Sequence, residues 1–322
     1  MDAARRKSWL RAASWIVAAV IIALVAVKLT GDLAQLRAHP LEERPRWALV
    51  FASGALFLVA HAVLVQTWRS VLATWDARLP FWTAARIWSV SNLGRYIPGK
   101  VWQIGAMGAM SREVGVSPIA ASGSAILGTL VNVIAGFVVA LASGRSLLER
   151  TSPGWSGVAT IIVFVSGAGL LLAPLIVPRI APAVGRLMGR PVTATLPARA
   201  VVHSLVGNLI AWLLYGAAFE LFTRGLLSGA TGEYSAYLAA YTISYLAGYL
   251  ALFAPAGAGV REGMMLAVLQ YAGLASAPQA ALVTIGSRVW LTLLEVTPGF
   301  LFWALHRVRR TSQTTDQPDV PT

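Results

Sequence analysis

Six apolar runs, each about 20 residues or longer, constrain this chain more than any other feature of its sequence. A helical run of that length crosses roughly 30 Å of hydrocarbon, so each is expected to span a membrane. The chain is 57% hydrophobic and only 12% charged, which is typical of a protein embedded in lipid. We therefore expect an all-α integral membrane protein, a polytopic helical bundle. The runs are Leu10–Leu29, Trp47–Trp68, Pro118–Leu141, Val158–Val177, Val201–Phe222 and Leu282–Leu305.

Two further stretches combine glycine, proline and charge between helical segments. They are Asn92–Lys100, with the sequence NLGRYIPGK, and Pro255–Glu262, with the sequence PAGAGVRE. Irregular backbone is tolerated at membrane depth only where it is buried in protein or lines a wet cavity, because lipid cannot satisfy the freed amides. The breaks are therefore expected to lie at the functional site, either as re-entrant hairpins or as interrupted crossings. The segment Pro80–Leu93 rises only about 20 Å, which favours a re-entrant or interfacial piece.

The formal net charge of +13 is concentrated beside the expected spans. Cytoplasmic loops of membrane proteins carry an excess of lysine and arginine, so this placement indicates topology rather than nucleic-acid binding. Both termini are therefore expected in the cytoplasm of a multi-pass plasma (inner) membrane protein. The residues concerned are Arg5, Arg6, Lys7 and Arg11 before the first span, Arg179, Arg186, Arg190 and Arg199 in one loop, and Arg307, Arg309 and Arg310 after the last span.

The two breaks align when the sequence is shifted by 160 residues, which brings Gly99 onto Gly259 and Pro118 onto Pro278. In each half a break is followed by a short helix, a turn of small residues and a full span. With the expected topology the two units start on opposite sides, which makes an inverted repeat, the arrangement typical of transporters with a central site. The alternative is that the glycines only let helices pack closely, which does not explain the charges at both breaks.

The domain prediction follows from this repeat. Residues 1–310 form a single membrane domain with half-repeats at about 80–143 and 235–305, and residues 311–322 form a disordered cytoplasmic tail.

A cation stands beside each break. Lys100 follows Pro98 and Gly99 at the start of a new helical stretch. Free backbone amides and the positive end of the helix dipole favour an anion there, and phosphate suits such a place. Arg261 holds the equivalent place after the second break. Its neighbour Glu262 is expected either to take a capping or ion-pair role with Arg261, or to contact a headgroup.

Two more charges lie in the last span, where Arg288 and Glu295 are seven residues apart and hence on one helical face. A charge near the bilayer centre costs at least about 2.5 kcal/mol, so they are expected to face the bundle interior and to pair with each other. The other candidate site residues are Arg95, Asn92 and Tyr96 for the headgroup or its path, Gly99, Gly257 and Gly259 for close backbone approach, and Pro98 and Pro255 as structural residues.

Several kinds of chemistry are disfavoured by the sequence. The chain has no cysteine, and its four histidines show no close metal-ligand spacing, so no metal or other cofactor is expected. Gly94–Lys100 fits part of a phosphate-binding P-loop, but Val101 stands where the magnesium-binding hydroxyl belongs. No catalytic constellation is found, so an enzyme is not the first expectation.

The broken stretches resemble the transmembrane, flippase-like part of the lysylphosphatidylglycerol synthase family. The matching pieces are Leu93–Trp102, Gly115–Ser117, Pro255–Glu262 and Arg288, and the likeness covers roughly residues 11–307. The family usually has Pro-Gly-Gly in the second motif, where Ala256 here replaces the first glycine. The resemblance implies a domain that moves lipid between leaflets, in synthases aminoacylated phosphatidylglycerol. The soluble aminoacyl-transfer domain has no counterpart here, so lysyl transfer is not expected.

The function expected from these features is translocation of an anionic or phosphate-bearing lipid between leaflets. Lys100 and Arg261 would hold the phosphate, and Arg95 and Arg288 would support it. Membrane lipids are the expected partners, with a homo-oligomer or a separate synthase as further possibilities. Two alternatives stay open: a glycosyltransferase using a polyprenyl-phosphate sugar, with Asp32, Glu42 and Glu43 as candidate bases, and a non-transporting subunit of a lipid-modifying system.

Overall fold

The structure is a computed structural model that describes residues 44–96, 102–151, 154–187, 195–251 and 257–315. These residues form nine α-helices and one short 3-10 helix, and they contain no strand. Five of the helices are long and apolar enough to cross a membrane, which confirms the all-α polytopic membrane protein predicted from the apolar runs. They are α2 (Trp47–Ala73), α5 (Pro118–Thr151), α6 (Trp155–Leu187), α7 (Ala198–Leu226) and α10 (Ala277–Thr315).

The first expected span, Leu10–Leu29, lies outside the described residues. At the other end, α10 continues to Thr315, five residues past the predicted start of the tail. No glycine or proline follows Gly299 until residue 318, so nothing in the local sequence ends the helix at 310.

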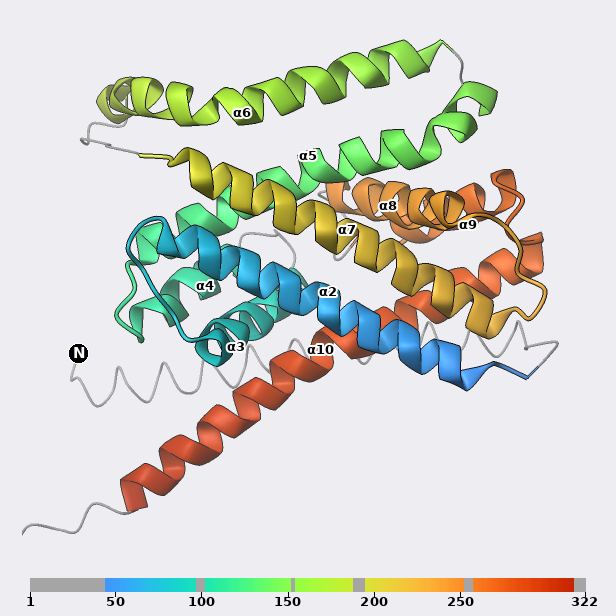
Figure 1. The fold of residues 1–322 in the computed structure, drawn as a ribbon. Helices are drawn as coiled ribbons and strands as arrows, with labels where there is room; N and C mark the ends of the chain where they lie inside the picture. Colours follow the sequence, from blue (N-terminus) through green and yellow to red (C-terminus); the bar gives the residue numbers. More distant parts are fainter. Residues whose placement is uncertain (1–43, 97–101, 152–153, 188–194, 252–256, 316–322) are drawn as a thin grey trace, which may run out of the picture.

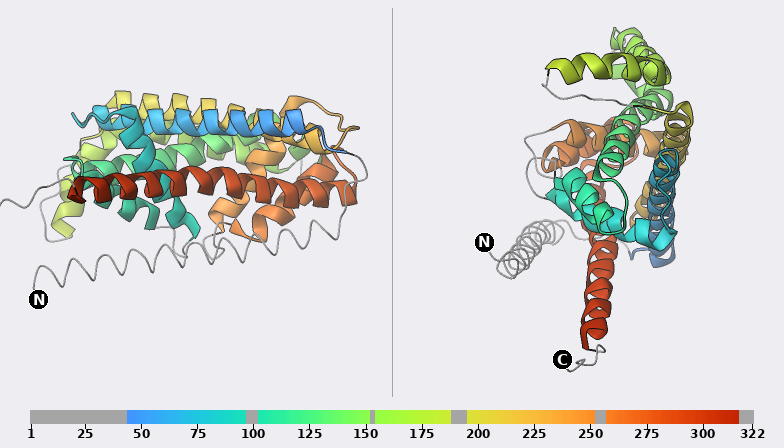
Figure 2. Two further views of the ribbon diagram at one scale, coloured as in Figure 1. Left: turned by 90° about the horizontal axis from the view of Figure 1, so that it is seen from below. Right: turned by 90° about the vertical axis from the view of Figure 1, so that its left-hand side faces the viewer.

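The long helices alternate in direction along the bundle (Figure 1). The antiparallel pair α2 and α7 pack side by side, and α5 lies against α7. Helix α6 lies at the outer edge, and many of its large apolar side chains are exposed (Figure 2). A helix that is apolar on all sides and little covered by protein suits contact with lipid.

The helices that flank the two breaks pack together in pairs, and we call these pairs the two helical hairpins. The first contains α3 (Phe81–Asn92), the 3-10 helix η1 (Leu93–Tyr96) and α4 (Trp102–Arg112). At 1.5 Å per residue, α3 and α4 are each too short to cross about 30 Å, and they pack against each other. The second hairpin contains α8 (Tyr234–Leu250) and α9 (Val260–Tyr271), which also pack together.

The hairpins lie toward opposite ends of the bundle (Figures 1 and 2). The first follows the end of α2, and the second follows the end of its antiparallel neighbour α7. The element order also repeats, because α9 begins 158 residues after α4 and α10 begins 159 residues after α5. The two halves therefore repeat the same order of elements, and their hairpins lie toward opposite ends of the bundle, as the predicted inverted repeat requires.

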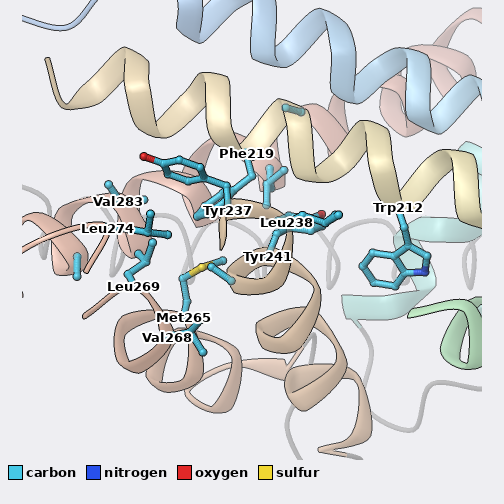
Figure 3. Packing of buried hydrophobic residues seen from close by; sticks show 14 of the residues in the cluster. Trp212, Phe219, Tyr237, Leu238, Tyr241, Met265, Val268, Leu269, Leu274 and Val283 are labelled. Carbon is cyan, nitrogen blue, oxygen red and sulfur yellow. The ribbon is translucent and has the colours of Figure 1, made fainter. Parts of the chain in front are cut away.

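The largest apolar core fixes the second hairpin against α7 and the first part of α10 (Figure 3). Tyr237 on α8, Met265 and Leu269 on α9 and Val283 on α10 are almost completely buried there. A second core holds the first hairpin against α2 and α5 around Leu72, Ile87 and Met107. Protein interiors are closely packed, so these two cores hold the hairpins in fixed positions against the long helices.

Candidate functional site

The two hairpins and the last span meet around a small cavity of about 80 Å³, which we call the cationic cavity. The first hairpin supplies its wall from η1 and α4, the second from α8 and α9, and α10 closes it. Its lining contains both charged and polar side chains. The lining residues are Arg95, Tyr96, Gln103, Tyr245, Gly248, Tyr249, Gly257, Arg261, Arg288, Leu291, Thr292 and Glu295.

Arg95 of the first hairpin is neutralised by the last span. Its Nη1 lies 2.7 Å from Oε1 of Glu295, and the hydroxyl of Tyr96 donates to the other carboxylate oxygen at 3.3 Å. A charge-assisted contact of this kind is stronger than one between neutral groups. Arg95 is therefore held in place by a protein carboxylate, and the hydroxyl of Tyr96 is hydrogen-bonded to the same carboxylate.

Arg288 of the last span is paired with Glu262 at the start of α9. The other oxygen of Glu262 accepts a bond from the backbone N–H of Gly259 at 2.6 Å, which forms a cap at the start of α9. The predicted pairing of Arg288 with Glu295 is therefore wrong. For Glu262 the expected capping role is confirmed, but its ion-pair partner is Arg288 and not Arg261. Arg288 and Glu295 lie on the same face of α10, but each pairs with a residue of a hairpin that packs against that face.

Arg261 is the one arginine of the cationic cavity for which no carboxylate partner is found among the described residues. The residue is only 5% exposed, and its Nε and Nη2 are buried without a hydrogen-bond partner. Its guanidinium carbon lies 5.3 Å from the ring centre of Tyr241 and 5.1 Å from that of Tyr245. Cation–π contacts stabilise the charge when it is desolvated, but the rings do not neutralise it.

The tyrosines under Arg261 form a ladder along α8. Tyr241, Tyr245 and Tyr249 are spaced four residues apart, and neighbouring rings stack with centres 6.3 and 6.2 Å apart. Figure 3 shows Tyr241 beneath α7, where Trp212 also lies. These tyrosines are not among the predicted site residues, although their spacing of four in an apolar helix is visible in the sequence.

Two glycines bring the ends of the second hairpin together. A Cβ on Gly257 would lie 2.7 Å from both the Cα and the carbonyl oxygen of Gly248, and Gly257 has a φ of +71°, which favours glycine. The close backbone approach predicted for Gly257 is thus an approach to α8, and Gly257 also lines the cavity. Gly259 has a φ of +83° and stands at the N-cap of α9.

A second cavity of about 110 Å³ adjoins the first, and we call it the neutral cavity. The two share Arg95, Gln103, Tyr245, Tyr249 and Glu295, so the Arg95–Glu295 pair stands between them. Its other walls come mainly from α2, α3, α5 and α7. Asn92 lines it, and its Oδ1 accepts a bond from Gln103 at 2.6 Å, which ties the end of α3 to α4.

Four predicted site residues lie outside the described residues: Pro98, Gly99, Lys100 and Pro255. The described ones, Asn92, Arg95, Tyr96, Gly257, Arg261, Arg288 and Glu295, all line one or both cavities, and Glu262 and Gly259 support the cationic one from α9. Sequence reasoning missed Gln103, Gly248 and the tyrosine ladder.

A third and larger depression, of about 940 Å³, lies between α5, α6, α8 and α9. Apolar side chains such as Phe137, Ile162 and Met264 line it. Lipid chains fill a groove of this kind in any membrane protein, so it does not distinguish one function from another. No protein-family model matches the chain, and no curated protein matches it either.

Proposed function

We propose that this protein moves an anionic, phosphate-bearing lipid between the leaflets of a membrane, and that Arg261 receives the phosphate. The observation that carries the proposal is a buried guanidinium that faces a cavity and has two donor nitrogens without a partner. Such an arrangement is costly in the empty protein, since a buried charge is normally paired. A phosphate would supply the missing negative charge and accept both bonds.

The charge balance around the cationic cavity supports an anion. Among the described residues, Arg95, Arg261 and Arg288 contribute three positive charges and Glu262 and Glu295 two negative ones, so one positive charge remains. Two of the arginines are paired with carboxylates, which leaves Arg261 as the source of the excess. Ionisable residues inside a membrane protein that face a cavity typically mark a substrate path.

The position of the cavity favours transport over simple binding. Its walls come from hairpins that lie toward opposite ends of the bundle. Each hairpin borders the cavity and reaches a different end, so small movements of one against the other would open the site to one side at a time. Broken helices of inverted repeats serve this purpose in transporters. The resemblance to flippase-like domains agrees with this function.

A glycosyltransferase receives less support from the site. Among the described residues, Glu295 in the cavity wall and Glu262 beside it are both paired with arginines, so neither is placed to act as a general base. The acidic residues first considered for that role, Asp32, Glu42 and Glu43, lie outside the described residues.

The experiment is a leaflet assay with the purified full chain in liposomes. Phosphatidylglycerol labelled on an acyl chain is included, and dithionite, which does not cross the bilayer, bleaches label in the outer leaflet. With an active flippase the inner-leaflet label also becomes accessible. We expect this for the natural chain and not for Arg261→Gln, because glutamine removes the charge that holds the phosphate.

The control variant is Arg145→Gln, which removes an exposed arginine paired with Glu149 four residues along α5. It should move lipid as the natural chain does, because an exposed ion pair contributes little. Both variants must enter liposomes in equal amounts. The proposal fails if the natural chain leaves the inner leaflet protected for every anionic lipid tested, or if Arg261→Gln transports normally.

A further inference from the structure

The neutral cavity contrasts in chemistry with the cationic cavity beside it. Its only formal charges among the described residues are Arg95 and Glu295, which pair with each other, and His61 is its one other titratable side chain apart from tyrosines. Hydroxyl, amide and indole groups make up its remaining polar surface. The polar residues are Thr67, Asn92, Gln103, Ser124, Thr129, Asn132, Ser204 and Asn208.

Five of these polar side chains lie on two spanning helices, α5 and α7. On α5, Ser124, Thr129 and Asn132 face the cavity; on α7, Ser204 and Asn208 do. Polar side chains within spans are costly unless they bond to protein, water or ligand. Some bonds are local: Asn208 donates to the carbonyl oxygen of Ser204 at 2.8 Å. This bond uses the amide N–H and leaves the side-chain carbonyl of Asn208 as an acceptor.

Three tryptophans also line the neutral cavity, and one of them holds an unused donor. Trp68 donates to Ser124 at 2.8 Å, and Trp212 donates to the backbone oxygen of Asn132 at 3.0 Å. The indole Nε1 of Trp88 is buried without a hydrogen-bond partner. Buried polar groups are rarely left without a partner, so an unused donor on a cavity wall points to a ligand or water that occupies the cavity.

We infer that the neutral cavity binds an uncharged, hydroxyl-rich headgroup, a glycerol or a sugar, attached to the phosphate that Arg261 receives. This inference rests on the proposed function, because the two cavities adjoin and share five lining residues. Hydroxyl groups both donate and accept, which suits a wall of amides, hydroxyls and an indole donor. Aromatic walls also suit the apolar faces of a sugar ring.

The same geometry disfavours a headgroup that carries an ammonium. Glu295 is committed to Arg95 and Glu262 to Arg288, so the described residues offer no spare carboxylate for a cation. The described residues around the cationic cavity carry an excess positive charge, which would repel an ammonium group on the headgroup. The lysyl ester of phosphatidylglycerol, the substrate class implied by the family resemblance, therefore fits this site less well than phosphatidylglycerol itself.

The test measures binding rather than transport, with short-chain lipids that differ only in headgroup. Dihexanoyl phosphatidylglycerol, phosphatidic acid, phosphatidylethanolamine and lysyl-phosphatidylglycerol are titrated against the purified full chain, and affinity is obtained from thermal stabilisation. Phosphatidylglycerol should bind at least tenfold more tightly than the two lipids with an ammonium group. If all four bind equally, the headgroup inference fails while the phosphate site stands. If none binds, the proposed function fails with it.

A substitution assigns the preference to the neutral cavity. Trp88→Phe removes the unpartnered Nε1 donor and keeps an aromatic ring, so it should lower affinity for phosphatidylglycerol about fivefold, the value of one hydrogen bond. Affinity for phosphatidic acid, which lacks the polyol, should not change. Trp82→Phe is the matched control, because Trp82 is 72% exposed and does not line the cavity.

A second variant guards against a packing effect at Trp88. Asn132→Leu replaces a polar side chain of the α5 wall with an apolar one of similar size, while the bond from Trp212 uses only the backbone oxygen of Asn132. It should reduce affinity for phosphatidylglycerol and leave that for phosphatidic acid unchanged. Unchanged phosphatidylglycerol binding in both variants would overturn the inference.

Discussion

The two hairpins occupy equivalent places in the two halves of the chain but treat their arginines differently. Arg95 of the first hairpin is neutralised by Glu295, which comes from the other half. Arg261 of the second hairpin lies over tyrosines of its own hairpin and has no carboxylate partner among the described residues. The repeat is therefore one of backbone arrangement, and the chemistry is divided unequally between the halves.

The long helices that follow the hairpins show the same division. A shift of 160 residues places Arg288 and Glu295 of α10 on Gly128 and Ala135 of α5. Helix α10 thus supplies the charges that pair with both hairpins, whereas α5 supplies small and polar residues to the neutral cavity. The second half therefore supplies most of the charged side chains at the site, and α5 of the first half supplies small and polar side chains to the wall of the neutral cavity.

The largest expected difference is in which side of the membrane each hairpin is reached from. If the halves are inverted, the turn before α5 and the turn after α7 lie on opposite sides of the membrane, the first in the cytoplasm with most of the loop arginines. The chain has no cysteine, so Ser117→Cys and Ser228→Cys each introduce a single thiol at an exposed turn. In intact cells a membrane-impermeant maleimide should label Ser228→Cys and not Ser117→Cys.

Permeabilised cells provide the control, because both thiols should then react. Labelling of both variants in intact cells, or of neither, would place the two turns on one side and remove the inverted arrangement. Labelling of Ser117→Cys alone would keep the inversion and reverse the predicted orientation of the termini.

The sequence predicted the spans well because membrane thickness alone fixes their length and composition. All five runs that fall in the described residues correspond to long helices. The charge pairs were predicted poorly. Spacing along α10 showed that Arg288 and Glu295 share a face, but not which elements lie opposite that face. The partner of Arg288 is Glu262, 26 residues away in the chain, and the partner of Glu295 is Arg95, 200 residues away. Contacts over such separations depend on how the helices pack.

The cavities were predictable only in part. Broken helices with charge indicated where a site would form, and the described residues flanking both breaks do line the cationic cavity. The neutral cavity depends on polar residues spread over five helices, and each of them alone is compatible with ordinary packing between spans. The spacing of the tyrosines on α8 was the one local signal that could have shown part of its wall.

The next largest effect is expected at the ion pair that joins the halves. Glu295→Gln leaves the Arg95 guanidinium without its carboxylate. Loss of one partner of a fully buried pair costs about 3–5 kcal/mol, and this pair, whose side chains are 26% and 15% exposed, should lose less. Arg95→Gln combined with Glu295→Gln should be less unstable than Glu295→Gln alone, since no lone charge remains. A double-mutant cycle on the free energy of unfolding in detergent measures this coupling. Additive losses would show that the halves are not linked through this pair.

The smallest of these effects is expected at the glycine contact that positions Arg261. A Cβ on Gly248 would lie 2.7 Å from the Cβ of Arg261, so Gly248→Ala must push the first turn of α9 away from α8. Overpacking of this kind costs about 1–3 kcal/mol, and it also displaces the guanidinium that we propose holds the phosphate. Gly263→Ala on α9 is the matched control, because no atom lies within 4 Å of its added Cβ. The free energy of unfolding and the rate of lipid movement should both fall for Gly248→Ala and change little for Gly263→Ala. A stable Gly248→Ala protein that moves lipid at the natural rate would show that lipid movement does not depend on the exact position of Arg261. The difference between the two hairpins would then lie in the pairing of their arginines and not in how closely their helices pack.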